Sequence, residues 1–311
     1  MATIIRRLPS WRVGDFELTS IARETGREVA DDDVPGLASE MAYHSFLALF
    51  PFLLLLAGLA SIVDDAFGVG NLTERIVEKA GQVMPEDATS VLEGFVAEVV
   101  NSDGTMAIVV GLLGALWAAS GAIGTSMKAL NRAYDVTEDR GFIRRKLVAL
   151  SLTVVFGGLI LTAAILVGTG QFLAAEIGEA LGWEETAVTV WNWLTLPAAV
   201  LLVMVAVAIL YWLAPNTGHS IEWITPGAIV FTVGWIVASL GFALYLANFG
   251  SYNRTYGSLS AVIILLVWLY WSNLILLVGG ELNAVLARRH DPEYRGEQGA
   301  RAESGGSRAQ P

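Results

Sequence analysis

The chain has 311 residues, of which 54% are hydrophobic and only 16% are charged. Soluble globular proteins carry about 25% charged residues, and here the deficit is concentrated in several long apolar runs. The composition therefore excludes an ordinary water-soluble enzyme and predicts an all-α, polytopic membrane protein. The chain contains no cysteine, which excludes disulfides, thiolate metal sites and cysteine nucleophiles.

The formal net charge is −11, from 19 Lys and Arg against 30 Asp and Glu. Nucleic-acid binding requires a clustered surplus of cations, so we expect no nucleic-acid partner. Only three of the cations are lysines, Lys79, Lys128 and Lys146. An acidic, lysine-poor exterior is favoured where abundant counter-ions screen self-repulsion, and it predicts a halophilic source.

Residues 1–40 carry arginines near their start, but no apolar core follows closely, so no cleavable signal peptide is predicted. Within them, five residues recur at helical spacing and predict a cytoplasmic amphipathic helix along the membrane surface. They are Leu18, Ile21, Ala22, Thr25 and Val29. The acidic residues 31–33 then precede Pro35, a pattern typical of a helix start.

A membrane-spanning helix needs about 20 mostly apolar residues. The segments that meet this requirement are 41–63, 105–126, 147–172, 188–214, 225–247 and 259–287. We therefore predict a bundle of six transmembrane helices that forms one membrane domain over residues 41–287.

The placement of cations predicts the orientation of this bundle. With six spans and both termini inside, all but three of the 19 Lys and Arg residues lie on the cytoplasmic side. The exceptions are Arg75, Lys79 and Arg254. Such an excess of cations on inner segments is typical of a multi-pass plasma-membrane protein.

The flanking and connecting segments differ in character. Residues 64–104 form the one sizeable outer segment, and helical spacing of its apolar residues predicts an amphipathic surface helix. Residues 127–146 form a basic inner loop, for which attraction to anionic lipid headgroups is the simplest explanation. The tail, residues 288–311, is rich in Gly, Ser, Arg and Glu and is predicted to be disordered and cytoplasmic.

Small residues follow one another at helix-packing intervals in the second and fifth spans. They are Gly111, Ala115 and Ala119, then Gly114, Ala118 and Ala122, and Gly234, Ala238 and Gly241. Because small side chains let helices approach closely in lipid, we expect packing seams. A narrow conduit lined by these helices is the alternative.

Prolines mark candidate helix breaks. Pro51 and Pro197 fall at similar depths in the first and fourth spans, and Pro215 follows the fourth span. Matching interruptions in the two halves of a three-plus-three protein occur around the midplane site of inverted-repeat transporters. Two unrelated kinks are the alternative.

Polar residues inside the sixth span are the strongest candidates for a functional site. Glu281 and Asn283 lie near its inner end and Asn273 lies near mid-membrane. Ionisable groups at such depth usually face the bundle interior or a cavity. Glu281 is thus either a proton or substrate coupling site, or a structural group that snorkels or pairs with a cation such as Arg144 or Arg145.

The three histidines, His44, His219 and His290, have neither HxxxH nor HxH spacing. Such scattered imidazoles do not predict a zinc site. The sequence also lacks the P-loop, serine-hydrolase and zinc-protease motifs. We therefore expect no cofactor, no metal, no catalytic residue and no enzymatic activity.

Six short segments between Gly36 and Arg289 carry a family resemblance. They are residues 42–51, 116–120, 130–134, 213–216, 256–259 and 279–283. By their order and spacing, the sequence resembles the YihY / virulence factor BrkB family, once labelled ribonuclease BN. The resemblance implies a six-helix integral membrane protein of the inner or plasma membrane. It associates some relatives with the cell envelope and others with lipid export.

These observations favour a transporter or exporter of a lipid or amphiphilic anion, with membrane lipid as its surroundings. The residues of the predicted pathway are Glu281, Asn273, Asn283, Arg254, Tyr256, Gly257 and Ser258. Residues 256–258 would line the outer mouth, where Arg254 would attract an anionic headgroup. The alternative is a non-catalytic scaffold that binds envelope partners or a second copy of itself. A membrane ribonuclease is the least favoured function, because metal-dependent hydrolysis needs clustered ligands.

Overall fold

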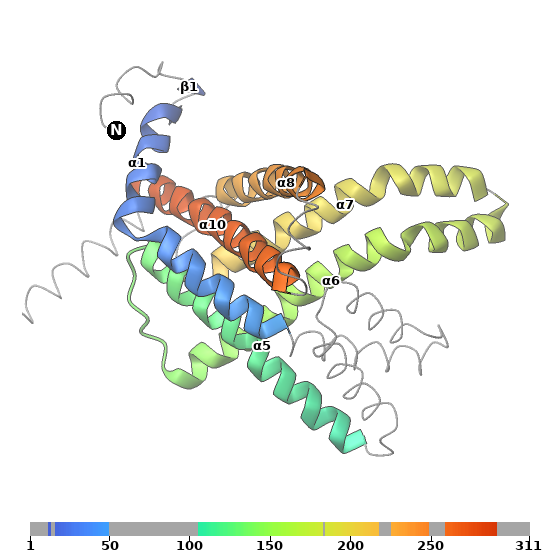
Figure 1. Ribbon diagram of the computed structural model, residues 1–311, viewed down its shortest axis with the longest axis horizontal. Helices are drawn as coiled ribbons and strands as arrows, with labels where there is room; N and C mark the ends of the chain where they lie inside the picture. Colours follow the sequence, from blue (N-terminus) through green and yellow to red (C-terminus); the bar gives the residue numbers. More distant parts are fainter. Residues whose placement is uncertain are drawn as a thin grey trace, which may run out of the picture.

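The computed structural model describes residues 12–13, 16–49, 105–182, 184–217, 225–248 and 259–290 (Figure 1). Its elements are β1 (Arg12–Val13), β2 (Phe16–Glu17), α1 (Leu18–Asp31), a helix over residues 34–49, α5 (Thr105–Ala133), α6 (Phe142–Leu181), α7 (Glu184–Leu213), α8 (Thr225–Asn248) and α10 (Leu259–His290). The predicted helical architecture is confirmed. In the described part of the chain, a short antiparallel β1–β2 ladder departs from the all-helical prediction; it pairs Arg12 with Glu17 and Val13 with Phe16.

Four of the described helices are long and apolar enough to cross a membrane. These candidate spans are Phe142–Ala163, Val188–Leu213, Thr225–Tyr245 and Val262–Arg289, and they correspond to the third to sixth predicted spans. The second predicted span lies in α5. The first begins in the helix over residues 34–49, whereas its remainder, Pro51, the outer segment 64–104 and the tail beyond 290 lie outside the described residues.

The helix predicted before the first span is present as α1. Ile21 and Thr25 are buried, as the periodicity requires, whereas Leu18 is exposed. Asp33 then begins the next helix, because its Oδ1 accepts a hydrogen bond of 3.3 Å from the N–H of Gly36. A side chain at Gly36 would overlap the Asp33 carboxylate, so a larger residue there would displace the capping side chain.

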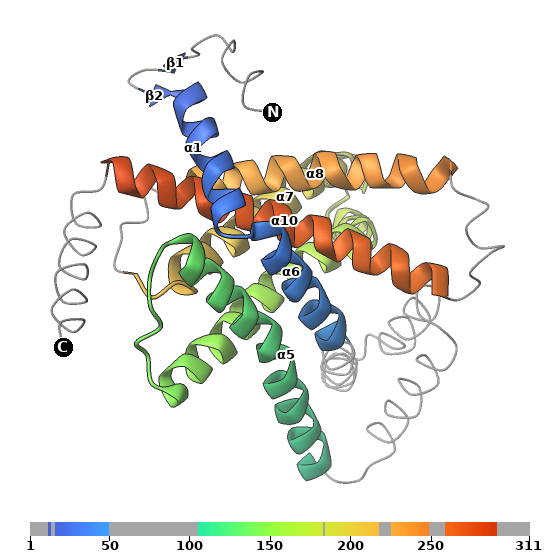
Figure 2. The same cartoon turned by 60° about the vertical axis from the view of Figure 1, so that its left-hand side comes forward.

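The helices are arranged around α10. Helices α6 and α7 form a long antiparallel pair, and α8 packs along α10 (Figure 1). Helix α1 crosses the other side of α10, and α5 contacts both α6 and α10 (Figure 2). Apolar side chains such as Val154, Leu201 and Leu240 are exposed on the outer faces of these helices, as expected of surfaces that contact lipid.

The largest hydrophobic core joins the C-terminal halves of α5, α7 and α10 to the first turns of α6, α8 and the helix over residues 34–49. Its largest fully buried members include Met41, Met127, Leu152, Tyr211 and Leu277. The core therefore lies toward the side on which residues 134–141 connect α5 to α6 and on which α7 ends. That side carries the polar groups described below.

The small-residue seams are only partly as predicted. A Cβ at Gly234 would lie 3.0 Å from Ile275 Cγ2, which places this residue in the α8–α10 contact. At Gly114 and Gly241 no atom of the described residues lies within 4 Å of the Cβ position, so the described helices form no close seam at these two residues. Helix spacing identifies a ridge of small residues, but the tilt of the helices decides which part of the ridge is in contact.

Candidate functional site

The C-terminal half of α10 is the centre of the candidate site, because each of its faces contacts a different element. Asn283 faces α8, where its Oδ1 accepts a hydrogen bond of 2.7 Å from the N–H of Gly227. A side chain at Gly227 would overlap the carbonyl oxygen of Gly279. The two helices therefore cross with their backbones in contact, which glycine permits. Two turns before Asn283, the carbonyl oxygen of Leu276 accepts a hydrogen bond of 2.5 Å from the buried hydroxyl of Tyr211.

A second face of α10 carries Glu281 and, one turn further, Val285, which packs against Ile21 of α1. The Glu281 side chain is fully buried, and among the described residues neither of its carboxylate oxygens has a hydrogen-bond partner. The charges that act on it are those of Asp32, Glu28 and Asp135, which are acidic, and of Arg288. A buried carboxylate without a direct partner is energetically costly in its ionised form, so the arrangement at Glu281 requires a reason other than stability.

Arg288 lies two turns beyond Glu281 on the same face of α10. Its Nη1 pairs with Asp135 Oδ2 at 2.7 Å, and its Nη2 lies 3.3 Å from Glu28 Oε1. The neighbouring Arg289 pairs with Glu24 and donates to Ser20 Oγ at 2.9 Å. These two arginines thus attach the end of α10 to α1 and to Asp135, two residues beyond the end of α5.

Asp135 occupies a constrained position at the end of α5. Its φ is +52°, and the N–H groups of Asp135 and Val136 bond to the carbonyls of Arg132 and Asn131, both at 2.9 Å. This is the Schellman helix end, whose left-handed residue is usually glycine or asparagine. Burial raises the pKa of Asp135, with Asp32 acting in the same direction, against the opposing charge of Arg288.

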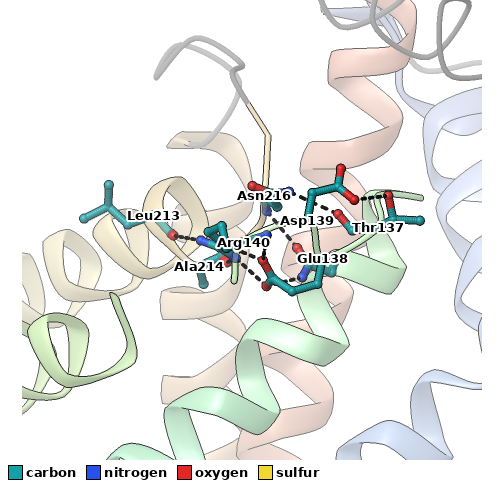
Figure 3. A network of polar contacts seen from close by, with 8 residues as sticks. Thr137, Glu138, Asp139, Arg140, Leu213, Ala214 and Asn216 are labelled. Carbon is teal, nitrogen blue, oxygen red and sulfur yellow. Dashed lines mark hydrogen bonds and ion pairs between the residues drawn. The ribbon is translucent and has the colours of Figure 1, made fainter. Parts of the chain in front are cut away.

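A network of polar contacts, which we call the polar junction, joins the α5–α6 connection to the end of α7 (Figure 3). It comprises Asn131, Thr137, Glu138, Arg140 and Asn216 with the carbonyls of Leu213 and Ala214. Arg140 donates from Nε and Nη2 to the two carboxylate oxygens of Glu138, at 2.6 and 2.7 Å. It also donates to the carbonyls of Leu213 and Ala214, at 3.4 and 2.8 Å.

Asn131 connects this junction to the segment after α7. Its Nδ2 donates to Glu138 Oε2 over 3.0 Å, and its Oδ1 accepts the N–H of Asn216 over 2.7 Å. Asn216 Nδ2 in turn donates to the carbonyl of Thr137 at 3.1 Å. Burial opposes ionisation of Glu138, but the hydrogen bonds from Arg140 and Asn131 and the charge of Arg140 outweigh it, so the pKa of Glu138 is lowered.

The structure brings only some of the predicted site residues together. Glu281 and Asn283 are both buried but point to different neighbours. Asn273 is half-buried and lies about 12 Å along the helix axis from Glu281. The residues expected at the outer mouth, Arg254 and 256–258, lie outside the described part of the chain.

The proposed pairing of Glu281 with Arg144 or Arg145 is wrong. In the described ranges no carboxylate forms an ion pair with either arginine, and Arg145 instead lines pockets beside α5. The reason is the length of the helices: α5 continues to Ala133 and α6 begins at Phe142. The non-helical connection is therefore residues 134–141, and Arg144 and Arg145 belong to the first turns of α6.

The structure also places two of the predicted prolines and one of the histidines. Pro197 lies inside α7, which continues through it, and is exposed. Pro215 is buried just beyond the end of α7, as expected of a helix-terminating proline. Of the three histidines, His44 is half-buried in the helix over residues 34–49, whereas His219 lies outside the described residues. Among the described residues no three His, Asp or Glu side chains are grouped so as to hold a metal ion.

The polar junction and the Arg288 ion pairs were not predicted from the sequence as contacts. The family resemblance did point to this region, because three of the segments that carry it meet at this side of the bundle. They are residues 130–134, 213–216 and 279–283. Leu130 contacts the backbone at Gly280, and Asn131 contacts Asn216.

Comparison with known proteins gives the family. The model of the family described as Virulence factor BrkB matches residues 25–304. The ribonuclease-like protein YfkH of Bacillus subtilis is 32% identical over 256 residues, which cover 81% of this chain and 90% of that protein. UPF0761 membrane proteins of Vibrio parahaemolyticus and Photobacterium profundum are 30% and 29% identical, each over 85% of this chain and over 81% and 79% of their own length. No solved structure matches the chain. The chain is thus a membrane protein that belongs to the virulence factor BrkB family.

Proposed function

We propose that this protein transports a lipid or another amphiphilic anion across the plasma membrane, and that Glu281 is the group whose change of charge is coupled to that movement. The observation that carries the proposal is the burial of Glu281, without a hydrogen-bond partner among the described residues, inside a candidate span. Ionisable side chains inside a membrane are expensive and generally mark a substrate, ion or proton pathway.

The surroundings of Glu281 indicate how such a change of charge would act. A negative charge at Glu281 is disfavoured by Asp32, Glu28 and Asp135, and among the described residues Arg288 alone favours it. Arg288 is already divided between Glu28 and Asp135. Ionisation of Glu281 would therefore draw Arg288 away from these partners and loosen the attachment of α10 to α1 and α5.

This redistribution supplies the two-state element that alternating access needs. When Glu281 is neutral, Arg288 holds α1 and the end of α5 against α10. When Glu281 is charged, it competes with Glu28 and Asp135 for Arg288. The neighbouring helices then gain freedom to move. An anionic substrate would be attracted by the exposed guanidinium groups of Arg132 and Arg144 on the same side. We propose that this side is cytoplasmic together with both termini.

The experiment is lipid translocation by the purified full-length chain in liposomes, at low and at high salt. Wild type is compared with Glu281→Gln, which keeps the shape of the side chain and removes its charge. The matched control is Asp139→Asn, because Asp139 is an exposed carboxylate of the same side. Translocation that falls in Glu281→Gln and persists in Asp139→Asn supports the proposal. Equal translocation by both variants refutes the role of Glu281, and none by folded wild type with several headgroups favours the scaffold function.

The name of the Bacillus subtilis relative brings a second candidate, RNA cleavage. A metal-dependent ribonuclease holds its ions with clustered carboxylates and imidazoles, and the described residues contain no such group. We propose that this chain does not cleave RNA, and the test is given in the Discussion.

A further inference from the structure

A basic groove lies between α5 and α6, away from Glu281. Its main cavity has a volume of about 280 Å³ and is lined by Lys128, Arg145 and Lys146 from the two helices, with no acidic side chain among the described residues of its wall. A second cavity of about 230 Å³ shares Lys128 and Arg145 and adds Arg132 and one carboxylate, that of Glu138, which Arg140 neutralises. The volume of the main cavity corresponds to about nine water molecules, so the groove has room for a polar headgroup and not only for a single ion.

The cations of the groove are only partly neutralised by the protein. Lys146 Nζ donates to Ser120 Oγ at 2.6 Å and to the carbonyl of Trp117 at 3.0 Å, both neutral acceptors. Lys128 pairs with Glu40 at 2.8 Å on an exposed edge. For Arg145, no carboxylate of the described chain lies within ion-pair distance. An anion in the groove would therefore meet positive charge that the fold leaves uncompensated.

The position of the groove matches the headgroup level of a membrane. Arg145 and Lys146 stand at the beginning of the candidate span Phe142–Ala163. Beside them, Phe142, Ile143 and Leu147 are exposed, and Lys146 Nζ lies 4.0 Å from the centre of the Trp117 ring, itself exposed. Cations and a tryptophan beside exposed apolar side chains are the combination found at the lipid–water interface.

The α5 wall of the groove is open because it is built from glycine. Gly121 and Gly124 line the main cavity, and no atom of the described residues lies within 4 Å of the position of a Cβ at either residue. The groove thus continues from the cations along a smooth helix surface, on which an acyl chain can lie.

We propose that the groove between α5 and α6 binds an acidic phospholipid, whose phosphate is held by Lys128, Arg145 and Lys146 and whose acyl chain lies along Gly121 and Gly124. Basic pockets between membrane helices recognise such headgroups by charge. The site is separate from Glu281 and does not depend on the proposed transport.

The test is binding of phosphatidylglycerol to the full-length chain, measured by native mass spectrometry and by thermal stabilisation in detergent, with phosphatidylcholine as the neutral lipid. Arg145→Gln is expected to weaken phosphatidylglycerol binding roughly fivefold, because each cation near a charged lipid surface raises the binding affinity by about that factor. Arg144→Gln is the matched control, since it removes the same charge from the same helix turn but does not line the cavities. Arg145→Lys is expected to retain binding.

A steric pair of variants tests the acyl-chain part. Gly124→Leu fills the groove, whereas Gly114→Leu adds the same side chain to α5 outside the groove, and at neither residue does the Cβ meet an atom of the described chain. We expect loss of phosphatidylglycerol binding in the first variant only. Equal weakening by Arg144→Gln and Arg145→Gln, equal binding of both lipids, or full stabilisation by inorganic phosphate or glycerol phosphate alone would each overturn the lipid site.

Discussion

The N–H of Gly227 at the start of α8 donates a hydrogen bond of 2.7 Å to Asn283 Oδ1 near the end of α10. This contact joins residues that are 56 positions apart in the chain and keeps the two helix backbones close. It also orients α10, because with Asn283 facing α8 the side chain of Glu281, two positions earlier, points to the opposite side of the helix. The buried carboxylate is therefore positioned by the glycine contact.

Gly227→Ala is expected to destabilise the fold by about 1–3 kcal/mol, because the added methyl overlaps the carbonyl of Gly279 and the amide of Asn283. The control is Gly241→Ala, in the same helix, where the Cβ position is open. That variant is expected to be unchanged or more stable, since alanine favours a helix by about 1 kcal/mol over glycine. Thermal unfolding in detergent compares the two. Equal melting temperatures for the variants would show that the helices do not cross at Gly227.

Glu138→Gln is expected to lower the free energy of unfolding at neutral pH by about 1–3 kcal/mol, because it removes the charge that Arg140 and Asn131 bind. The lowered pKa of Glu138 sets the pH dependence. The stabilisation is present above its ordinary value of 4.5 and is lost as the pH falls through the folded-state pKa.

The stability difference between wild type and Glu138→Gln should therefore shrink in acid. Asp139→Asn, the exposed neighbour, is the control and should stay within about 0.5 kcal/mol of wild type. A difference between wild type and Glu138→Gln that is constant from neutral to acidic pH would contradict the polar junction.

Asp135→Asn is expected to show the opposite pH dependence. Because the pKa of Asp135 is raised by burial, its ionised form contributes a loss of stability that begins above the ordinary value of 3.8 and is complete once the pH exceeds the folded-state pKa. Asparagine tolerates the left-handed backbone at this position. The variant should thus gain stability relative to wild type as the pH rises over this range, and chemical unfolding at a series of pH values measures it. A relative loss would contradict the direction of the shift.

The purified chain is expected to leave RNA intact in the presence of Mg²⁺ or Mn²⁺. The measurement is cleavage of a labelled RNA by wild type and by the triple variant His44→Ala, His219→Ala, His290→Ala. Metal-stimulated cleavage that disappears in the triple variant would contradict the expectation. Cleavage that persists in it would point to a contaminating nuclease or to ligands other than histidine.

Much of the helical architecture follows from local sequence. Long apolar runs predicted the helices α6, α7, α8 and α10, because hydrophobic length is the property that a membrane selects. The amphipathic spacing of residues 18–29 predicted α1, and the acidic residues before Pro35 predicted the helix start at Asp33.

The contacts between these helices were harder to predict from the sequence. Asn131 and Asn216 are 85 positions apart, and their pairing depends on how α5 and α7 end and on the tilt between them. The same reason explains why Gly241 is open while Gly227 is in contact. For Glu281, the sequence indicated an unusual position but named the wrong cations, since Arg288, on its own helix, and not Arg144 or Arg145, acts on it.

Lipid translocation by wild type and Glu281→Gln in liposomes, with Asp139→Asn as the control, tests the transport proposal most directly. We predict that wild type and Asp139→Asn move the lipid at comparable rates and that Glu281→Gln, although folded, moves it at least tenfold more slowly, roughly the effect of a single charged interaction of 1.4 kcal/mol. Unchanged translocation by Glu281→Gln would contradict the coupling role of the buried carboxylate.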